Sequence, residues 1–142
     1  MGRILAIDYG VKRTGVAVSD PLQLIAGGLD TLDTKQLEKW IVEYCATNDV
    51  TTIVVGMPRH TTSGEPAQTW KYIEPLVQRL KRAHPAIEVT LYDERYTSVL
   101  AHRTMLESGI GKMARRNKAL VDKISATIIL QSYMESREFK IK

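Results

Sequence analysis

Acidic residues stand where predicted strands end, which is where α/β sheets commonly place their chemistry. Asp8 follows the apolar run "ILAI", Asp93 and Glu94 follow "VTLY", and a further acid, Asp122, lies in the apolar stretch "ALVDKISA". A lone carboxylate that leaves water loses on the order of several kcal/mol or takes up a proton. Carboxylates that converge on a divalent cation avoid this penalty, because hard cations such as Mg²⁺ bind oxygen ligands. The acids therefore indicate a site that could activate water and hold the leaving oxygen of a phosphodiester.

Each acid also has an ordinary structural explanation. Asp8 can satisfy the backbone of the turn "DYG", and Asp122 can interact with the dipole of the final helix. Glu94 can pair with Arg95 at the surface. Adjacent strand residues face opposite ways, so "DER" offers two candidates for the middle ligand, of which we choose Glu94 and keep Asp93 as the alternative.

Positive charge accompanies the acids. With a net charge of +4 and a pI near 9.2, the protein as a whole is expected to attract polyanions weakly at neutral pH. A solvated loop is the ordinary explanation of basic clusters, but their position beside the acids predicts phosphate contacts. Gly10 would let a phosphate backbone approach closely and permit a tight exit from the first strand. The basic residues near the acids in sequence are Lys12, Arg13, Arg95, Lys112, Arg115 and Arg116.

The hydrophobic pattern predicts the elements that must position these residues. Two β-rich runs form an antiparallel hairpin, a third strand carries a bulge or bend at Gly27 and Gly28, and strands then alternate with helices. Pro75 predicts a kink or a late start of its helix. The expected fold is α/β, a five-stranded mixed sheet of three antiparallel and then two parallel strands, with helices on both faces. The predicted strands are 3–10, 14–20, 24–32, 51–58 and 87–95. The first predicted helix begins at Thr34, and the other predicted helices span 67–83, 97–109 and 117–136.

Length and composition set the remaining expectations. A chain of 142 residues with an ordinary apolar fraction is expected to form one domain over residues 1–142. No apolar run approaches the roughly 20 residues that span a bilayer, so we expect a cytoplasmic protein without membrane contact. The single cysteine, Cys45, lies on the apolar side of a predicted helix and is expected in the core.

Four ordered motifs identify a family. "ILAIDYGVKRTGVAVSD", "IVVGMP", "DERYTS" and "VDKISATIILQSY" resemble the YqgF/RuvX family of bacterial ribonuclease H-like proteins over nearly the whole chain. The resemblance implies a ribonuclease H-like fold, a hydrolase dependent on Mg²⁺ or Mn²⁺, and a part in maturing the 5′ end of 16S ribosomal RNA. Its catalytic, metal-binding acids would be Asp8, Glu94 and Asp122. The loop "GMPRHTTSG" departs from the family pattern, so the part played by Arg59 to Gly64 stays open.

The leading hypothesis is a metal-dependent endonuclease that acts on structured RNA. A nuclease for branched DNA shares the chemistry, and paired incisions would favour a dimer, so we expect a monomer or a weak homodimer. A nucleic-acid-binding factor with little catalysis is the alternative from another class. An ATP-binding protein of the actin and sugar-kinase type is disfavoured, because the chain has half the length that two such domains need.

Overall fold

The computed structural model describes residues 2–57, 70–93 and 118–141, with only the backbone described for Met57, Asp93, 118–122 and 137–141. Its five strands form one sheet in the order β3-β2-β1-β4-β5. The β1–β2 and β2–β3 pairs are antiparallel, and the β1–β4 and β4–β5 pairs are parallel, which confirms the predicted mixed sheet. The strands are β1 (Arg3–Asp8), β2 (Arg13–Ser19), β3 (Ala26–Asp33), β4 (Val50–Met57) and β5 (Glu88–Asp93).

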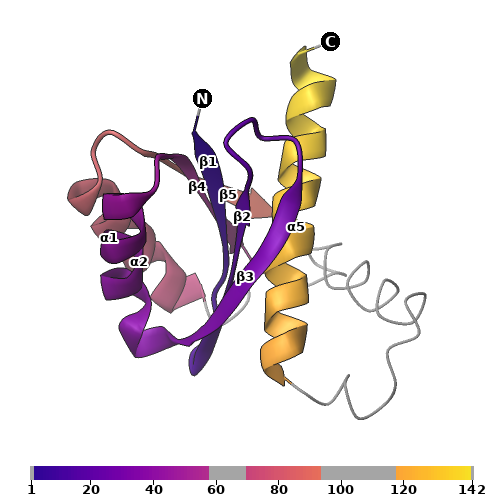
Figure 1. Ribbon diagram of the computed structural model, residues 1–142. Coiled ribbons are helices and arrows are strands. Elements are labelled where there is room, and N and C mark those ends of the chain that lie inside the picture. The colour runs from indigo at the N-terminus through magenta and orange to yellow at the C-terminus, as the bar shows by residue number, and fades with distance from the viewer. Residues whose placement is uncertain (1, 58–69, 94–117, 142) are drawn as a thin grey trace.

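Helices cover both faces of the sheet, as predicted. The helices α1 (Leu37–Thr47) and α2 (Trp70–Ala83) lie on one face, and α5 (Lys118–Ile141) crosses the other (Figure 1). A short 3₁₀ helix, η1 (Thr34–Gln36), links β3 to α1. The described residues include no helix with enough length and apolar character to cross a membrane.

The alternation of side chains along β1 builds two apolar layers. Leu5 and Ile7 pack into the cluster on the α1–α2 side, whereas Ile4 and Ala6 belong to the cluster on the α5 side. All four side chains are fully buried. Each large aliphatic side chain buried in this way contributes about 1.5–3 kcal/mol. The alternation of β1 therefore assigns each of its positions to one of the two sides.

The edge strand β3 carries the bulge that its glycines predict. Val16 pairs with Asp30 and Ala17 pairs with Gly28, so Leu29 is an extra residue on β3. Gly28 also lies against α5. A Cβ atom at Gly28 would lie 2.8 Å from Cγ of Lys123 and 2.9 Å from Oγ1 of Thr127, so the absence of a side chain lets α5 approach the strand closely.

Several elements differ from the predictions in detail. The final helix continues to Ile141, and α2 runs through Pro75 rather than beginning at it. The helix expected from Thr34 starts as η1, capped by Asp33, whose carboxylate accepts a hydrogen bond from the Lys35 N–H at 3.1 Å. Cys45 is half-buried against the α1–α2 core rather than inside it, and burial raises its pKa. The predicted helix 97–109 lies outside the described residues.

Candidate active site

Asp8 is the last residue of β1, at the end of the sheet where the parallel strands β1, β4 and β5 have their carboxyl ends. We call this end of the sheet the Asp8 edge. It is half-buried and stands opposite Gly15 on β2. Its position follows Ile4 and Ala6 in the alternation of the strand, and both of those residues pack on the α5 side. Asp8 therefore lies on the side of the sheet that α5 covers.

The parallel strands bring Asp93 to the same edge as Asp8. Asp93 ends β5 opposite Met57, and β4 separates it from β1. The preceding residue, Tyr92, packs on the α5 side, where its ring meets that of Tyr133 edge-on with the centroids 6.2 Å apart. Glu94 lies outside the described residues.

The third predicted acid belongs to the first turns of α5. Ala126 and Ile129 on this helix are fully buried against the sheet, and Tyr133 packs on the same cluster. Position 122 precedes them by four, seven and eleven residues, which are spacings that share one helix face. Position 122 therefore shares a helix face with these residues. Among the side chains that the structure describes, which do not include those of Asp93 and Asp122, no group of three or more His, Cys, Asp or Glu residues could hold a metal ion.

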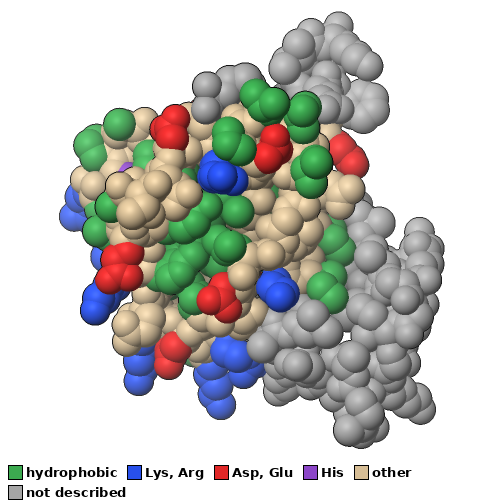
Figure 2. All heavy atoms as spheres, in the orientation of Figure 1, with side chains coloured by type: hydrophobic (Ala, Val, Ile, Leu, Met, Phe, Trp, Pro, Cys, Tyr) green, Lys and Arg blue, Asp and Glu red, His purple; other side chains and the backbone are tan. Residues whose placement is uncertain are grey.

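The turn between β1 and β2 carries two of the predicted phosphate-binding residues, Lys12 and Arg13. Lys12 is exposed and Arg13 is half-buried. A side chain at Gly10 would overlap the carbonyl oxygen of Arg13, so the turn itself needs a glycine there. In Figure 2, Lys and Arg side chains gather along the lower end of the visible face, which is the end where this turn lies in Figure 1. The other predicted residues, Arg95, Lys112, Arg115 and Arg116, lie outside the described residues, as does the loop 59–64.

Hydrogen bonds from Thr34 hold this turn, which the sequence reasoning missed. The Thr34 N–H donates to the carbonyl of Lys12 at 3.1 Å, and the Thr34 hydroxyl donates to the carbonyl of Gly10 at 2.6 Å. The hydroxyls of Thr14 and Thr34 lie 2.9 Å apart, and Thr14 is fully buried. The sequence signal is slight: a polar residue at an inward position of β2 and a second threonine just after β3.

The residue after Asp8 faces the opposite side of the sheet. Tyr9 packs against the α1–α2 core, and burial raises its pKa, an effect that the nearby guanidinium of Arg79 opposes. Arg79 on α2 in turn pairs with Glu38 on α1 at 2.9 Å. The α1–α2 side of this edge is therefore occupied by a tyrosine and an ion pair, which leaves the α5 side for the acid.

The loop between β2 and β3 lies at the other edge of the sheet. The Asp20 carboxylate accepts hydrogen bonds from the N–H groups of Leu22, Leu24 and Ile25 at 2.7–3.2 Å, and these bonds lower its pKa. The loop exposes its aliphatic side chains, and hydrophobic atoms gather over this upper end in Figure 2. Gln23 fixes the loop to β1 through a bond from its side chain to the carbonyl of Gly2 at 2.7 Å.

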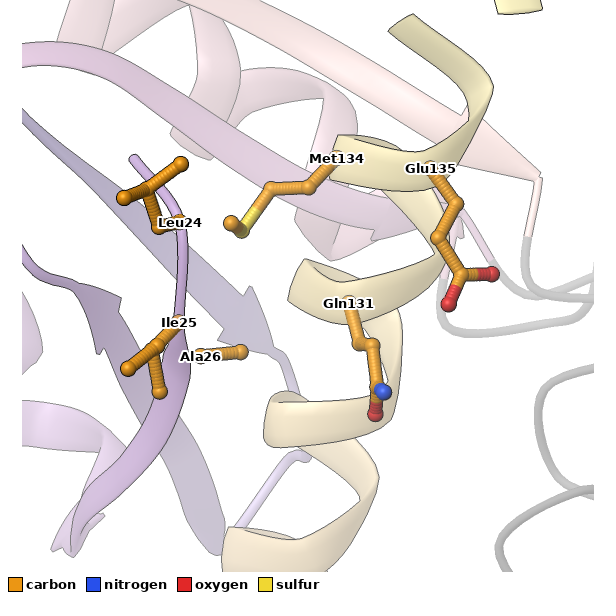
Figure 3. A pocket seen from close by; sticks show the side chains of 6 residues that line it. All are labelled: Leu24, Ile25, Ala26, Gln131, Met134 and Glu135. Atoms are coloured by element: carbon orange, nitrogen blue, oxygen red, sulfur yellow. The ribbon is translucent and has the colours of Figure 1, made fainter. Parts of the chain in front are cut away.

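A hollow of about 350 Å³ lies between this loop and α5. Met134 extends from α5 toward Leu24, whereas Glu135 turns away (Figure 3). The hollow lacks a cluster of ionisable groups and is separated from Asp8 by the length of β1. We therefore place the candidate active site at the Asp8 edge and not in this hollow.

Known proteins share this architecture. The structure of Thermus thermophilus RuvC in complex with a Holliday junction substrate matches with a TM-score of 0.60 and 15% sequence identity, over 97% of this chain and 96% of that chain. A second Thermus thermophilus RuvC structure matches with a TM-score of 0.51. The mixed sheet with helices on both faces is thus that of a protein with the ribonuclease H-like fold.

Sequence comparison assigns the family within this fold class. The family model described as "RuvX: Holliday junction resolvase" matches residues 2–136. A Bacteroides thetaiotaomicron protein named "Putative pre-16S rRNA nuclease" is 56% identical over 139 residues, which is 98% of this chain and 100% of the relative. A Parabacteroides distasonis protein of the same name is 50% identical over 141 residues, which is 99% of this chain and 100% of the relative. The chain belongs to the RuvX family.

Proposed function

We propose that this protein is a metal-dependent endonuclease that processes the 5′ end of pre-16S ribosomal RNA. The observation that supports the proposal is the position of Asp8, which ends β1 on the α5 side of the sheet. Position 122 shares a helix face with Ala126 and Ile129, which pack on that side. Tyr92 faces the same side, so an acid two positions later on a continued strand shares that side. This alternation supports Glu94 over Asp93 as the middle acid.

The donor set fits a hard divalent cation. Asp8, Glu94 and Asp122 would supply carboxylate oxygens, which suit Mg²⁺ or Mn²⁺ and not the softer metals that cysteine and histidine select. A bound cation supplies a more acidic water and stabilises negative charge on the reacting phosphate. Asp8 belongs to a central strand, position 122 belongs to α5, and Glu94 directly follows β5 in the sequence.

Basic residues at this edge would grip the sugar-phosphate backbone. Lys12 and Arg13 stand in the turn directly after Asp8, and Arg95, Lys112, Arg115 and Arg116 add charge from other parts of the chain. Contacts of this kind supply affinity and position the strand but carry little sequence information. Gly10 would allow the backbone to approach the turn closely.

The names of the relatives support RNA as the substrate. A second candidate function is cleavage of branched DNA, which the description of the family model and the RuvC complex with a Holliday junction favour. We propose that the protein works in the cytoplasm, where ribosomal RNA is processed. We also propose that the chain forms one domain and that the protein is a monomer or a weak homodimer.

The test incubates the purified protein with 5′-extended small-subunit rRNA precursor and, separately, with a four-way DNA junction. Each substrate is combined with Mg²⁺, Mn²⁺ or EDTA. We expect cleavage of the RNA that requires metal. Cleavage of the junction alone would support the second candidate function, and binding without any cleavage would support a binding factor.

The variant Asp8→Asn tests the role of the acid. It keeps the shape of the side chain but removes its charge, so we expect cleavage to fall by about 100-fold or more while RNA binding stays within about threefold. Asp49→Asn is the matched control, because Asp49 is an exposed acid at the opposite edge, just before β4. Equal activity of Asp8→Asn and the control would contradict the assignment.

A further inference from the structure

We propose that Thr34 is a positioning residue, which acts through the β1–β2 turn to place Lys12 and Arg13 beside Asp8. The inference rests on the proposed function, because it assigns a purpose to the site described there. It is independent of the acids themselves, since Thr34 carries no charge and belongs to the junction between β3 and η1.

The contacts form a clamp around the turn. Thr34 reaches back 24 residues to donate its hydroxyl to the Gly10 carbonyl at 2.6 Å, and its N–H bonds the Lys12 carbonyl at 3.1 Å. A hydroxyl has one proton to donate, so the Thr14 hydroxyl must donate to that of Thr34, over 2.9 Å. The three residues thus form a directed chain from Thr14 through Thr34 to Gly10, and each bond in such a chain polarises the next.

The location of the clamp explains why it bears on the site. The β2–β3 ladder ends where Arg13 pairs with Asp33, so Thr34 is the first residue beyond it and lies across the mouth of the turn. Gly10 stands two residues after Asp8, and a Cβ atom added there would overlap the Arg13 carbonyl oxygen. Because backbone atoms on both sides of Val11 are held, the Lys12 side chain leaves from a fixed point. A basic residue on a fixed turn loses less freedom when it binds a phosphate than one on a mobile loop.

Thr34→Val and Thr34→Ser separate positioning from simple stability. Valine keeps the shape and loses the hydroxyl, whereas serine keeps the hydroxyl. Thr47→Val is the matched control, because the Thr47 hydroxyl bonds carbonyls of its own helix at the end of α1, away from the turn. Each variant is assayed for cleavage of the rRNA precursor and for the slope of log Kd against log salt, with the folded fraction measured by circular dichroism.

For Thr34→Val we expect kcat/KM to fall about tenfold, because displacement of a positioned group by about 1 Å costs up to about 100-fold. The salt slope should decrease by about one, which corresponds to one lost phosphate contact. Thr34→Ser and Thr47→Val should stay within about twofold of the wild type. The salt slope does not depend on the folded fraction, so a merely structural role would leave it unchanged.

The positioning role would be wrong if Thr34→Val had the same salt slope and the same kcat/KM as the wild-type protein, after correction for the folded fraction. Wild-type protein that binds RNA without cutting it would overturn the proposed nuclease alone, and the salt slopes would still decide the role of Thr34. Wild-type protein that neither binds nor cuts RNA or the junction would overturn both.

Discussion

Replacing Gly28 with alanine places a methyl group between β3 and α5. The new Cβ would lie 2.8 Å from Cγ of Lys123 and 2.9 Å from Oγ1 of Thr127, and ordinary contact begins near 3.4 Å. Either these side chains or α5 itself must therefore shift by the difference between 3.4 and 2.8 Å, which is about 0.6 Å. Rotation of Thr127 would relieve part of the overlap only by breaking the bond from its hydroxyl to the Lys123 carbonyl at 2.8 Å.

The neighbouring Gly27 supplies a matched control. Its nearest atom to an added Cβ is the Val18 carbonyl oxygen at 3.9 Å, so alanine fits there without displacement. Gly27→Ala should stabilise the fold by about 0.4–1 kcal/mol, because alanine restricts the unfolded chain. Gly28→Ala has the same benefit but adds an overpacking cost of about 1–3 kcal/mol. The two variants should therefore differ in the free energy of unfolding by about 1–3 kcal/mol.

Urea denaturation followed by circular dichroism measures this difference through the midpoints at constant slope. Activity gives a second readout, because the displaced turn of α5 contains Lys123, directly after Asp122. We expect Gly28→Ala to lower the cleavage rate about tenfold or more at temperatures where it remains folded. Equal midpoints for the two alanine variants would refute the close packing of α5 on β3.

Two further predictions concern the loops at the two edges of the sheet. Gly10→Ala should destabilise the protein by about 1–3 kcal/mol and weaken RNA binding, because the added methyl group overlaps the Arg13 carbonyl. Urea denaturation midpoints and the Kd for RNA measure the two effects, and unchanged values would contradict the prediction. The backbone bonds that lower the pKa of Asp20 stabilise the fold fully above about pH 4. This contribution is lost as pH falls through the lowered pKa, so protection of the Leu24 and Ile25 amides against hydrogen exchange should decline in acid, and constant protection would count against the bonds.

Local sequence patterns predicted most of the fold, because the apolar residues along each strand indicate which of its faces are buried. The apolar runs of β1 and β4 followed from burial on both faces of the sheet, because each of these strands carries fully buried side chains on the α1–α2 side and on the α5 side. The glycines at 27 and 28 correctly indicated a bulge, which the structure places at Leu29. The observed bounds of an element differ from the predicted ones where tertiary contacts determine them. At Thr34 the chain first forms η1 and hydrogen-bonds to the β1–β2 turn before α1 begins.

The sequence indicates candidate site residues by their type and position but not by their geometry, and their roles stay predictions. Asp8 could be selected from the sequence because a carboxylate ends an apolar strand. Nothing local showed which face Tyr92 occupies, and its packing on the α5 side supports the choice of Glu94, which stays a prediction. The contacts of Thr34 were also hidden from the sequence, because its hydroxyl partners Thr14 and Gly10 lie 20 and 24 residues earlier in the chain.

During synthesis the two faces of the sheet become covered at different times. The helices α1 and α2 precede β5 in the chain, whereas α5 follows it. A nascent chain that has reached β5 can bury Leu5 and Ile7 but leaves Ile4, Ala6 and Val54 without the helix that covers them. Exposed apolar strands of this kind invite aggregation or the binding of chaperones. Docking of α5 is therefore the step that removes this apolar surface from water, and it can occur only after the last helix has been synthesised.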